Sequence, residues 1–287
     1  MFDAIVIGGG PAGVSASLYI KRANLSVKLF YLKDSNVSYA SKIDNYYGFE
    51  SGISGKDLYE NGINQAKNLG VEISSEEVIK IENLGKSFKV ITNNNEYEAL
   101  SIVLATGDKK NKPNIEGIDR FTGKGVSYCA ICDAFFYRGK DVAVIGNGNF
   151  ALSEAEELKN LVKSVTILTN GETLESAEFD VIDKKIKSIN GDEKVRSVTF
   201  EDDEEKAIDG VFIALGQANA SDFAKTLGIV ENGDNIKVNE KMETNIKGIY
   251  ACGNITGGLK QISKAVYDGT IAGISCIEYV RNLKKEN

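Results

Sequence analysis

The start of the chain places an apolar run directly before a glycine-rich turn. Residues 2–7 form a short apolar segment, GGGPAG follows at 8–13, and residues 14–23 have a helix-like composition. Short apolar runs bounded by Gly and Pro favour buried strands, and a helix directly after the turn opens a βαβ unit. A parallel sheet is therefore expected to begin at the N-terminus.

The following segments supply more elements of the same unit. Residues 25–32 place β-forming side chains among polar ones and predict a second strand. Residues 56–69 predict an amphipathic helix that ends at Gly70. The runs VEIS, SFKVITN and ALSIVLA predict further strands, and NNN at 93–95 predicts a turn.

The opening pattern occurs a second time. From Val142, VAVIGNGNFA again reads as strand, glycine turn and helix, and the two turns lie 138 residues apart, counted from Gly8 to Gly146. The later stretch KGIYACGN does not continue the second unit and returns to the first. We predict an α/β fold of two Rossmann-like, doubly wound, three-layer domains, the second inserted in the first. The predicted boundaries are 1–112 with 242–287 for the first domain and 113–241 for the second.

Composition narrows the class of protein. The chain has 287 residues and a net charge of -7, whereas a general nucleic-acid binder needs a basic face. The longest uncharged run, residues 4–20, is split by the consecutive Gly8, Gly9 and Gly10 and by Pro11, so it predicts neither a membrane span nor a signal peptide. We expect a cytoplasmic protein with no nucleic-acid or membrane partner.

Gly8, Gly10 and Gly13 form G-x-G-x-x-G between a predicted strand and a predicted helix, which is the context of a dinucleotide site. Gly8 permits a tight turn, Gly10 lets the backbone approach a pyrophosphate, and Gly13 lets helix and strand pack closely. This context disfavours a purely structural glycine turn. An acidic residue is expected about 20 residues later to hold a ribose, and only Asp34 lies close to the end of the second strand.

Gly146, Gly148 and Ala151 have the same backbone logic and, taken alone, predict a nicotinamide nucleotide. The segment TNGETLESAEFD after the next strand has no Lys or Arg to meet a 2′-phosphate. Residues 172–205 carry twelve Asp or Glu against five Lys or Arg. NADPH is therefore not expected, whereas NADH stays open because Glu172 can reach a ribose. We interpret this domain as a scaffold that has lost its nucleotide.

Cys129 and Cys132 form a C-x-x-C motif in a chain that contains no His. A structural zinc site needs four ligands, and the isolated Cys252 and Cys276 offer no second pair, so redox chemistry is favoured over a metal site. In such a pair one thiolate attacks and the other thiol resolves the mixed disulfide. Asp133 has two compatible interpretations: a cap for the helix that follows, or a proton donor and acceptor for the thiols.

Five motifs occur in order along the chain: GGGPAG at 8–13, SIVLATG at 101–107, CAICDAFFYRGKDVAVIGNGN at 129–149, VFIALG at 211–216 and GIYACGN at 248–254. Together they resemble the low-molecular-weight, bacterial-type thioredoxin reductases over nearly the whole chain. The resemblance implies FAD in the first domain, the C-x-x-C in the second, and a homodimer. It also implies a rotation between domains that presents the dithiol alternately to flavin and to thioredoxin.

The resemblance further implies roles for single residues. Cys132 would face the flavin, Cys129 would attack thioredoxin, and Asp133 would be the acid and base. The residues that dock thioredoxin would be Phe135, Phe136 and Arg138. The residues that contact FAD would be Gly8, Gly10, Pro11, Ala12, Gly13, Asp34, Asn36, Asn45, Thr106, Gly107, Gly253, Asn254, Gln261 and Ile262.

Departures from the pattern indicate a subgroup. Members that use NADPH carry a basic HRR-type cluster after the second glycine motif, where this chain has TNG, and only 70 residues separate Gly146 from Gly216. The chain is most similar to the ferredoxin-dependent flavin thioredoxin reductases, which lack a usable pyridine-nucleotide site. The stretch DSNVSYASKIDNYYGFE replaces a glycine-rich loop, and Asn254 replaces an FAD-contacting aspartate. An amide can still donate a hydrogen bond there.

The expected function is electron transfer from reduced ferredoxin through FAD and the cysteine pair to thioredoxin or a similar protein. Because ferredoxins are acidic, docking needs a local basic patch, for which the candidates are Lys109, Lys110, Lys112 and Lys124. Three alternatives stay open. They are an NAD(P)H-dependent thioredoxin reductase with an atypical nucleotide site, an FAD dithiol oxidase that uses oxygen, and a non-catalytic flavin-binding sensor or partner-binding protein.

Overall fold

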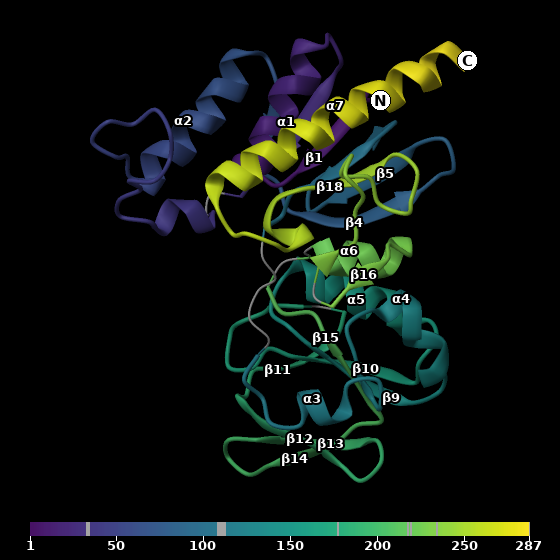
Figure 1. Ribbon diagram of the computed structural model, residues 1–287. Coiled ribbons are helices and arrows are strands. Elements are labelled where there is room, and N and C mark those ends of the chain that lie inside the picture. The colour runs from purple at the N-terminus through teal and green to yellow at the C-terminus, as the bar shows by residue number, and fades with distance from the viewer. Residues whose placement is uncertain are drawn as a thin grey trace. The chain divides into compact units, whose positions relative to one another are not determined.

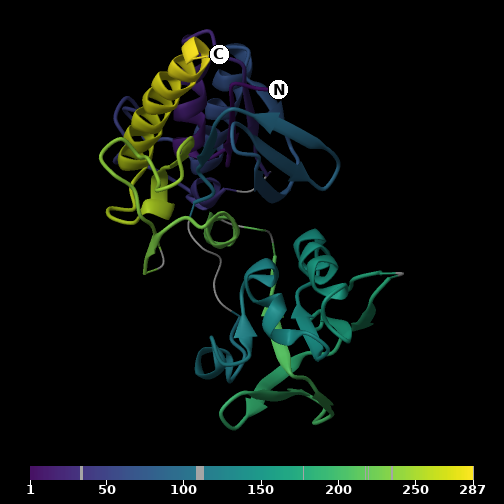
Figure 2. The ribbon, with the colours of Figure 1, turned by 90° about the vertical axis from the view of Figure 1, so that its right-hand side faces the viewer.

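Two compact units make up the chain. The computed structural model describes residues 1–32, 35–107, 113–176, 178–216, 218, 220–233 and 235–286, without the side chains of Ile131, Cys132 and Ala220. The first unit combines Met1–Lys109 with Asn219–Asn287, and the second, Lys110–Ala218, is inserted between these two segments. Each unit is a sheet with helices packed on it (Figures 1 and 2). The predicted α/β fold with one domain inserted in another is confirmed.

The first unit is built on a parallel sheet. Its elements are β1 Ala4–Ile7, α1 Pro11–Arg22, β2 Val27–Phe30, η1 Asn36–Tyr39, α2 Gly55–Asn68, β3 Glu72–Ser74, β4 Val78–Asn83, β5 Phe88–Thr92, β6 Glu96–Ala99, β7 Ile102–Leu104, α6 Ala220–Leu227, β16 Glu231–Asn232, β17 Asn235–Ile236, β18 Ile249–Ala251, η3 Gly253–Thr256 and α7 Ile262–Glu286. The parallel strand order is β18-β7-β1-β2-β3, and β4-β5-β6 form an antiparallel sheet. The order reverses between β1 and β7, which is where such sheets bind ligands.

Helices and side chains bury this sheet on both faces. α1 and α7 lie side by side in both ribbon views (Figures 1 and 2). All residues of β1 and β2 are buried, as a parallel sheet covered by two layers requires. The charged residue among them, Lys28, places its Nζ 2.7 Å from Glu72 Oε1 and 4.6 Å from the Tyr97 ring centroid. These partners offset part of the cost of burying an ammonium group.

The second unit repeats the plan. Its elements are α3 Ile118–Phe121, β8 Val126–Ser127, α4 Ala130–Asp133, η2 Ala134–Tyr137, β9 Asp141–Ile145, α5 Asn149–Lys159, β10 Ser164–Leu168, β11 Asp180–Ile182, β12 Ile186–Gly191, β13 Val195–Phe200, β14 Glu205–Ala207 and β15 Gly210–Ile213. The parallel sheet has the order β11-β10-β9-β15-β8, and β12-β13-β14 form an antiparallel sheet. Gly8 N–H donates to Phe30 O at 2.8 Å, and Gly146 N–H donates to Leu168 O at 3.0 Å. The backbone of the two glycine turns is therefore held in the same way.

The chain returns to the first unit earlier than the sequence indicates. The sequence predicts that the chain returns to the first domain at residue 242, whereas the first unit resumes at Asn219. α6 packs against β4 and β17 and buries Phe223 and Ala224 there. An amphipathic helix of this length fits either domain, so its apolar pattern alone does not say which sheet it covers.

Helix length and composition bear on membrane insertion. α7 is 25 residues long, but charged residues such as Asp268 and Arg281 interrupt its apolar positions. Across the described ranges, no helix combines the length and the apolar composition that crossing a bilayer requires.

Candidate functional site

The first glycine turn is crowded at two positions and roomy at the third. A Cβ on Gly8, whose φ is +116°, would lie 2.2 Å from Ala105 O, and a Cβ on Gly13 would lie 1.8 Å from Gly8 O. A Cβ on Gly10 would meet Ser35 Oγ at 3.6 Å, an ordinary contact. Gly8 and Gly13 thus serve packing, while Gly10 leaves the N-terminus of α1 accessible to a pyrophosphate.

The loops that follow the central strands meet beside this turn. Cys252 N–H, just after β18, donates to Leu104 O at the end of β7 at 3.0 Å. A Cβ on Gly253 would lie 2.9 Å from Ala12 Cβ, so the loop after β18 contacts the start of α1. Residues 106–107 leave β7 at the same edge of the sheet. Predicted dinucleotide-site residues from three separate segments are therefore brought together.

Two further predicted residues meet although they are 216 positions apart in the chain. Asn45 Nδ2 donates to Gln261 Oε1 at 3.1 Å. The next residue, Ile262, lines a pocket of about 540 Å³ together with Gly10 and Pro11 of the glycine turn. The start of α7 and the loop around Asn45 are therefore neighbours of the dinucleotide turn.

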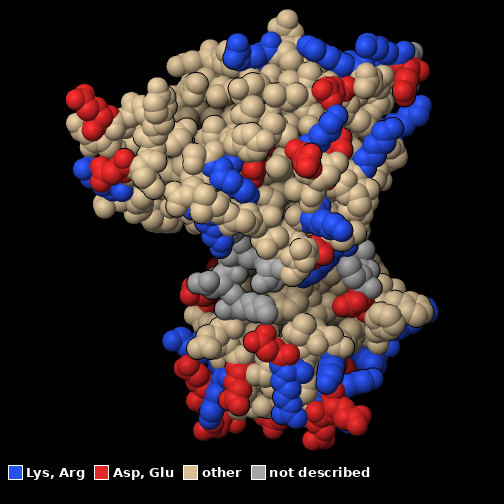
Figure 3. All heavy atoms as spheres, viewed as in Figure 1, with Lys and Arg blue, Asp and Glu red and all other residues tan. Residues whose placement is uncertain are grey.

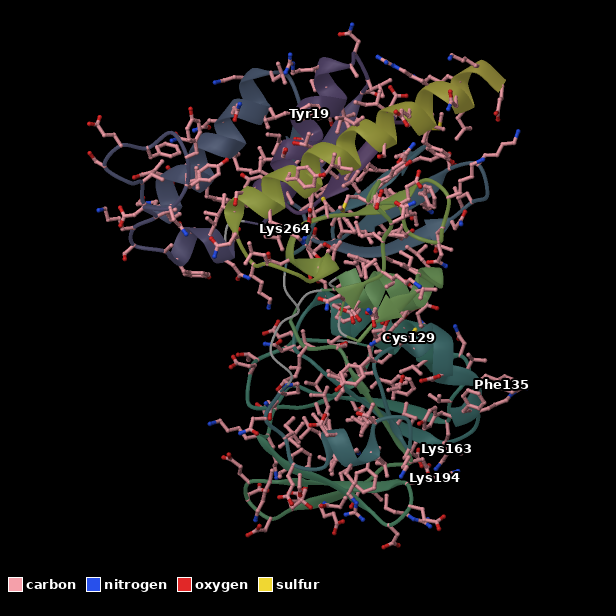
Figure 4. All side chains as sticks on the ribbon, viewed as in Figure 1. Tyr19, Cys129, Phe135, Lys163, Lys194 and Lys264 are labelled. Carbon is pink, nitrogen blue, oxygen red and sulfur yellow. The ribbon has the colours of Figure 1, made fainter. Side chains whose placement is uncertain are left out.

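Lys264 holds the loop after β18 in place (Figure 4). Its Nζ lies 2.9 Å from Gly253 O, 2.7 Å from Gly257 O and 2.7 Å from Asp268 Oδ2. Asp268 is 2% exposed and accepts the Gly253 N–H at 3.1 Å. The pair anchors the loop that carries Asn254. Sequence reasoning missed both residues, whose i,i+4 spacing on a helix is a common surface pattern.

For three other predicted FAD-contacting residues, the structure gives at most a position. Asn36 is exposed at the start of η1, and Asn254 lies within η3. Asp34 lies outside the described residues. A carboxylate that holds the ribose therefore stays a prediction.

The second glycine turn keeps the backbone geometry of the first. A Cβ on Gly146 would lie 2.2 Å from Ala214 O, the distance found between the Gly8 position and its equivalent carbonyl. Gly148 leaves more room, since its Cβ would lie 3.5 Å from Gly216 O. The turn itself is thus compatible with a dinucleotide.

The segment after β10 decides which dinucleotide can bind, because the ribose substituents lie there. Asn170 Oδ1 accepts the Ile186 N–H at 2.9 Å. Lys185, an exposed residue, passes close to Gly171, where a Cβ would meet Lys185 Cγ at 2.6 Å. The sequence placed Lys185 only in an overall charge balance, but the fold brings this cation to the end of β10. Around β12–β14, acidic and basic side chains are intermixed (Figure 3).

Cys129 precedes the short helix α4 and is 4% exposed. It is disulfide-bonded, and the side chain of Cys132 lies outside the described part of the chain. Ser127 Oγ accepts the Cys129 N–H at 3.1 Å and donates to Asp133 Oδ2 at 2.7 Å. Asp133 makes no side-chain hydrogen bond that caps η2. The capping interpretation is therefore wrong, and the carboxylate is bonded to the cysteine turn instead.

A second carboxylate contacts the same turn. Glu154 of α5 is 6% exposed and accepts the Ala130 N–H at 2.6 Å. Burial, and then the charge of Asp133, raises the pKa of the nearby Tyr137 phenol. Sequence reasoning missed Glu154 because an acidic residue in a Glu-rich helix usually belongs to the solvated face.

Two aromatic side chains project from η2. Phe135 and Phe136 are 71% and 69% exposed, and their rings meet edge to face with centroids 6.3 Å apart. Figure 4 shows Phe135 pointing away from the second unit. Arg138, which follows, is exposed as well. Adjacent exposed aromatic residues are typical of protein interaction surfaces.

Comparison with known proteins shows that both glycine turns and the cysteine turn lie within one family match. The family model of pyridine nucleotide-disulphide oxidoreductases matches residues 2–269. The chain belongs to the pyridine nucleotide-disulphide oxidoreductase family. The thioredoxin reductase of Bacillus subtilis (strain 168) is 34% identical over 307 residues, which cover 99% of this chain and 96% of that protein.

Solved structures of the family are similar over the same length. The atypical thioredoxin reductase TRi of Desulfovibrio vulgaris Hildenborough has a TM-score of 0.93 and 36% identity, with 98% of this chain and 99% of that chain covered. A ferredoxin-flavin thioredoxin reductase of Clostridium acetobutylicum has a TM-score of 0.75 and 35% identity, with 98% of each chain covered. This family member is thus a thioredoxin reductase-like flavin disulfide oxidoreductase.

FAD is the cofactor expected of such a family member, and the first glycine turn fits it. The turn is closely packed at Gly8 and Gly13 and open at Gly10, as the approach of a pyrophosphate requires.

Cys252 and Cys276 are free, buried thiols, and burial raises the pKa of both. Within the described ranges, no three His, Cys, Asp or Glu side chains gather in a group that could hold a metal ion.

Proposed function

We propose that this protein reduces thioredoxin or a thioredoxin-like protein with electrons that come from reduced ferredoxin through FAD and the Cys129–Cys132 pair. The observation that carries the proposal is the disulfide-bonded Cys129, in a turn that Ser127 joins to Asp133. Bound FAD would accept electrons singly and deliver two of them to a disulfide.

The cysteine pair then performs thiol–disulfide exchange. The Cys129 thiolate attacks one sulfur of the partner disulfide, forms a mixed disulfide and expels the other partner sulfur as a thiolate. Cys132 attacks the Cys129 sulfur, restores the disulfide of the pair and releases the second partner thiol. Two electrons and two protons pass to the partner. Asp133, bonded to Ser127 Oγ at 2.7 Å, takes the proton of an attacking thiol and returns it to a departing one.

Charge in the segment that follows β10 favours ferredoxin rather than NADPH as the donor. Residues 172–205 are predominantly acidic, and two of their lysines are committed to carboxylates: Lys184 to Asp202 at 2.7 Å and Lys187 to Asp203 at 2.6 Å. Lys185 is the basic side chain that argues the other way, because it reaches the end of β10. The relative from Clostridium acetobutylicum is named for ferredoxin.

An anaerobic titration of the flavin tests the donor. We expect reduced ferredoxin to bleach the flavin at least roughly 100-fold faster than equal reducing equivalents of NADPH or NADH, because facing like charges cost several kcal/mol. Fast bleaching by either nucleotide would contradict the proposal and favour the NAD(P)H-dependent alternative.

Of the lysines proposed to dock ferredoxin, Lys124 is exposed, and Lys109, Lys110 and Lys112 lie outside the described residues.

The exposed pair Phe135 and Phe136 is proposed to dock thioredoxin. We expect replacement of both by Ala to raise the KM for thioredoxin roughly tenfold or more, because exposed aromatic residues of this kind are common binding hot spots. The rate of flavin reduction by the donor should stay unchanged. Leu84→Ala, which removes an apolar side chain that is 53% exposed in the first unit, is the matched control. An equal change in KM for both variants would rule out specific docking.

A homodimer is proposed to form through the apolar surface of α1 and α7. Tyr19, Tyr267 and Ile274 on these two adjacent helices are 38%, 61% and 41% exposed. Tyr19, labelled in Figure 4, also lines the pocket beside the glycine turn. The exposed Tyr47 lines the same pocket. A two-fold dimer would cover such a patch on both copies. Sedimentation equilibrium that finds only 31.1 kDa particles would contradict this assembly.

A further inference from the structure

Two carboxylates, rather than one, hold the turn that begins at Cys129. Asp133 is connected to the Cys129 N–H through Ser127 Oγ. Glu154 accepts the following N–H, that of Ala130, directly at 2.6 Å. Glu154 is 6% exposed and belongs to α5, which packs against α4. Burying a carboxylate to this extent is costly, so the bond to the turn is a specific feature of the fold.

The contact matters because the Ala130 N–H lies at the start of α4, next to Cys129. In C-x-x-C motifs, N–H groups at the start of a helix and nearby cations stabilise a thiolate. Here a carboxylate occupies the amide, and its charge opposes a second negative charge on Cys129. Among the described residues, the other ionisable groups near this turn include Tyr128, Asp133, Tyr137 and, farther out, Lys140, whose Nζ lies 5.4 Å from the Tyr137 ring centroid.

We propose that Glu154 is a positioning residue that fixes the Ala130 amide and restrains thiolate formation at Cys129. The inference rests on the proposed function only in that Cys129 is taken as the attacking thiol. Because the thiolate and not the thiol is the nucleophile, the restraint protects the reduced pair from small electrophiles and oxidants. The thioredoxin disulfide, held close by docking, reacts in spite of it.

Titration of a single active thiol tests the proposal. In the full-length Cys132→Ser variant, Cys129 cannot form its proposed disulfide, and Glu154→Gln then removes the charge while keeping a hydrogen-bond acceptor. We expect E154Q to raise the thiolate fraction about tenfold at about pH 7, measured by ultraviolet absorbance. Alkylation by iodoacetamide should accelerate only about threefold, because nucleophilicity falls as the thiol becomes more acidic. Cys252 and Cys276 stay silent, since burial raises the pKa of both.

Glu156→Gln in the same background is the matched control. Glu156 lies on the same helix, is 51% exposed and pairs with Lys159. An unchanged thiolate fraction in E154Q, or an equal change in E156Q, would overturn the proposal. If E154Q does not fold, the same titration of the Cys129 thiol in the C132S variant tests the proposal. Half-ionisation of this thiol at or above pH ~8.5 supports the restraint, and half-ionisation below that pH overturns it. No step uses ferredoxin or thioredoxin, so a wrong donor or acceptor leaves the result interpretable.

Discussion

Replacement of Cys129 by Ser is expected to lower the rate of thioredoxin reduction on the order of 10³-fold or more. A serine hydroxyl is not ionised near neutral pH and cannot form the mixed disulfide, so exchange stops at its first step. FAD affinity should stay unchanged, because the dinucleotide turn lies in the first unit and Cys129 in the second. Steady-state release of thioredoxin thiols and flavin fluorescence measure the two effects.

Cys276→Ser is the control for loss of a thiol. Cys276 is a free, fully buried cysteine whose Sγ lies 3.3 Å from Ser101 Oγ, so a hydroxyl can take its place. This variant should keep its turnover within about twofold, as conservative replacements away from a reacting centre do. Full activity in C129S would contradict the enzyme hypothesis and favour the non-catalytic flavin-binding alternative.

Alanine substitutions at Gly13 and Gly10 are expected to change different properties. Gly13→Ala should lower the stability of the fold, and Gly10→Ala should lower the affinity for FAD. In Gly13→Ala the new Cβ would lie 1.8 Å from Gly8 O, a backbone atom that cannot move without opening the turn. We expect the free energy of unfolding of the apoprotein to fall by about 3 kcal/mol or more. In Gly10→Ala the Cβ meets Ser35 Oγ at 3.6 Å, and φ is -72°, which suits alanine. Unfolding should change by less than about 0.5 kcal/mol.

FAD binding separates the two variants. Gly10→Ala puts a methyl group where the backbone approaches a pyrophosphate, so FAD affinity should fall roughly 100-fold in a protein of unchanged stability. Urea unfolding of the apoprotein and fluorescence titration with FAD measure the two quantities. Tight FAD binding by G10A would place the pyrophosphate elsewhere and contradict the assignment of this turn.

The backbone of the sites was predictable because it depends on local signals. β1 and β9 could be predicted from their short apolar runs. The turns after them could be predicted from their glycines, because a side chain at Gly8 or Gly146 would collide with the backbone. The meeting of Asn45 with Gln261, by contrast, depends on how segments 216 residues apart pack, and no local pattern contains that information. The family resemblance supplied it instead.

Polar groups buried by tertiary contacts were the least predictable. Glu154 and Lys264 lie on helices where charged residues usually face solvent, and packing against α4 and η3 gives each of them a backbone partner. The charge of Lys185 could be read from the sequence, but its position beside Gly171 could not, because that position depends on how the segment between β11 and β12 folds. The charge count of residues 172–205 therefore gave the net negative charge of this segment but not the position of Lys185, a cation beside Gly171.

The insertion of one unit in the other orders events during synthesis. β7 is made early, but its neighbour β18 follows 147 residues later, as the Ile102–Ile249 register shows. α1 likewise waits for α7 to cover it (Figure 1). The second unit is continuous in sequence and leaves the ribosome whole before the first can close its sheet. Until then the nascent chain presents the unpaired edge of β7, a surface on which a chaperone would act.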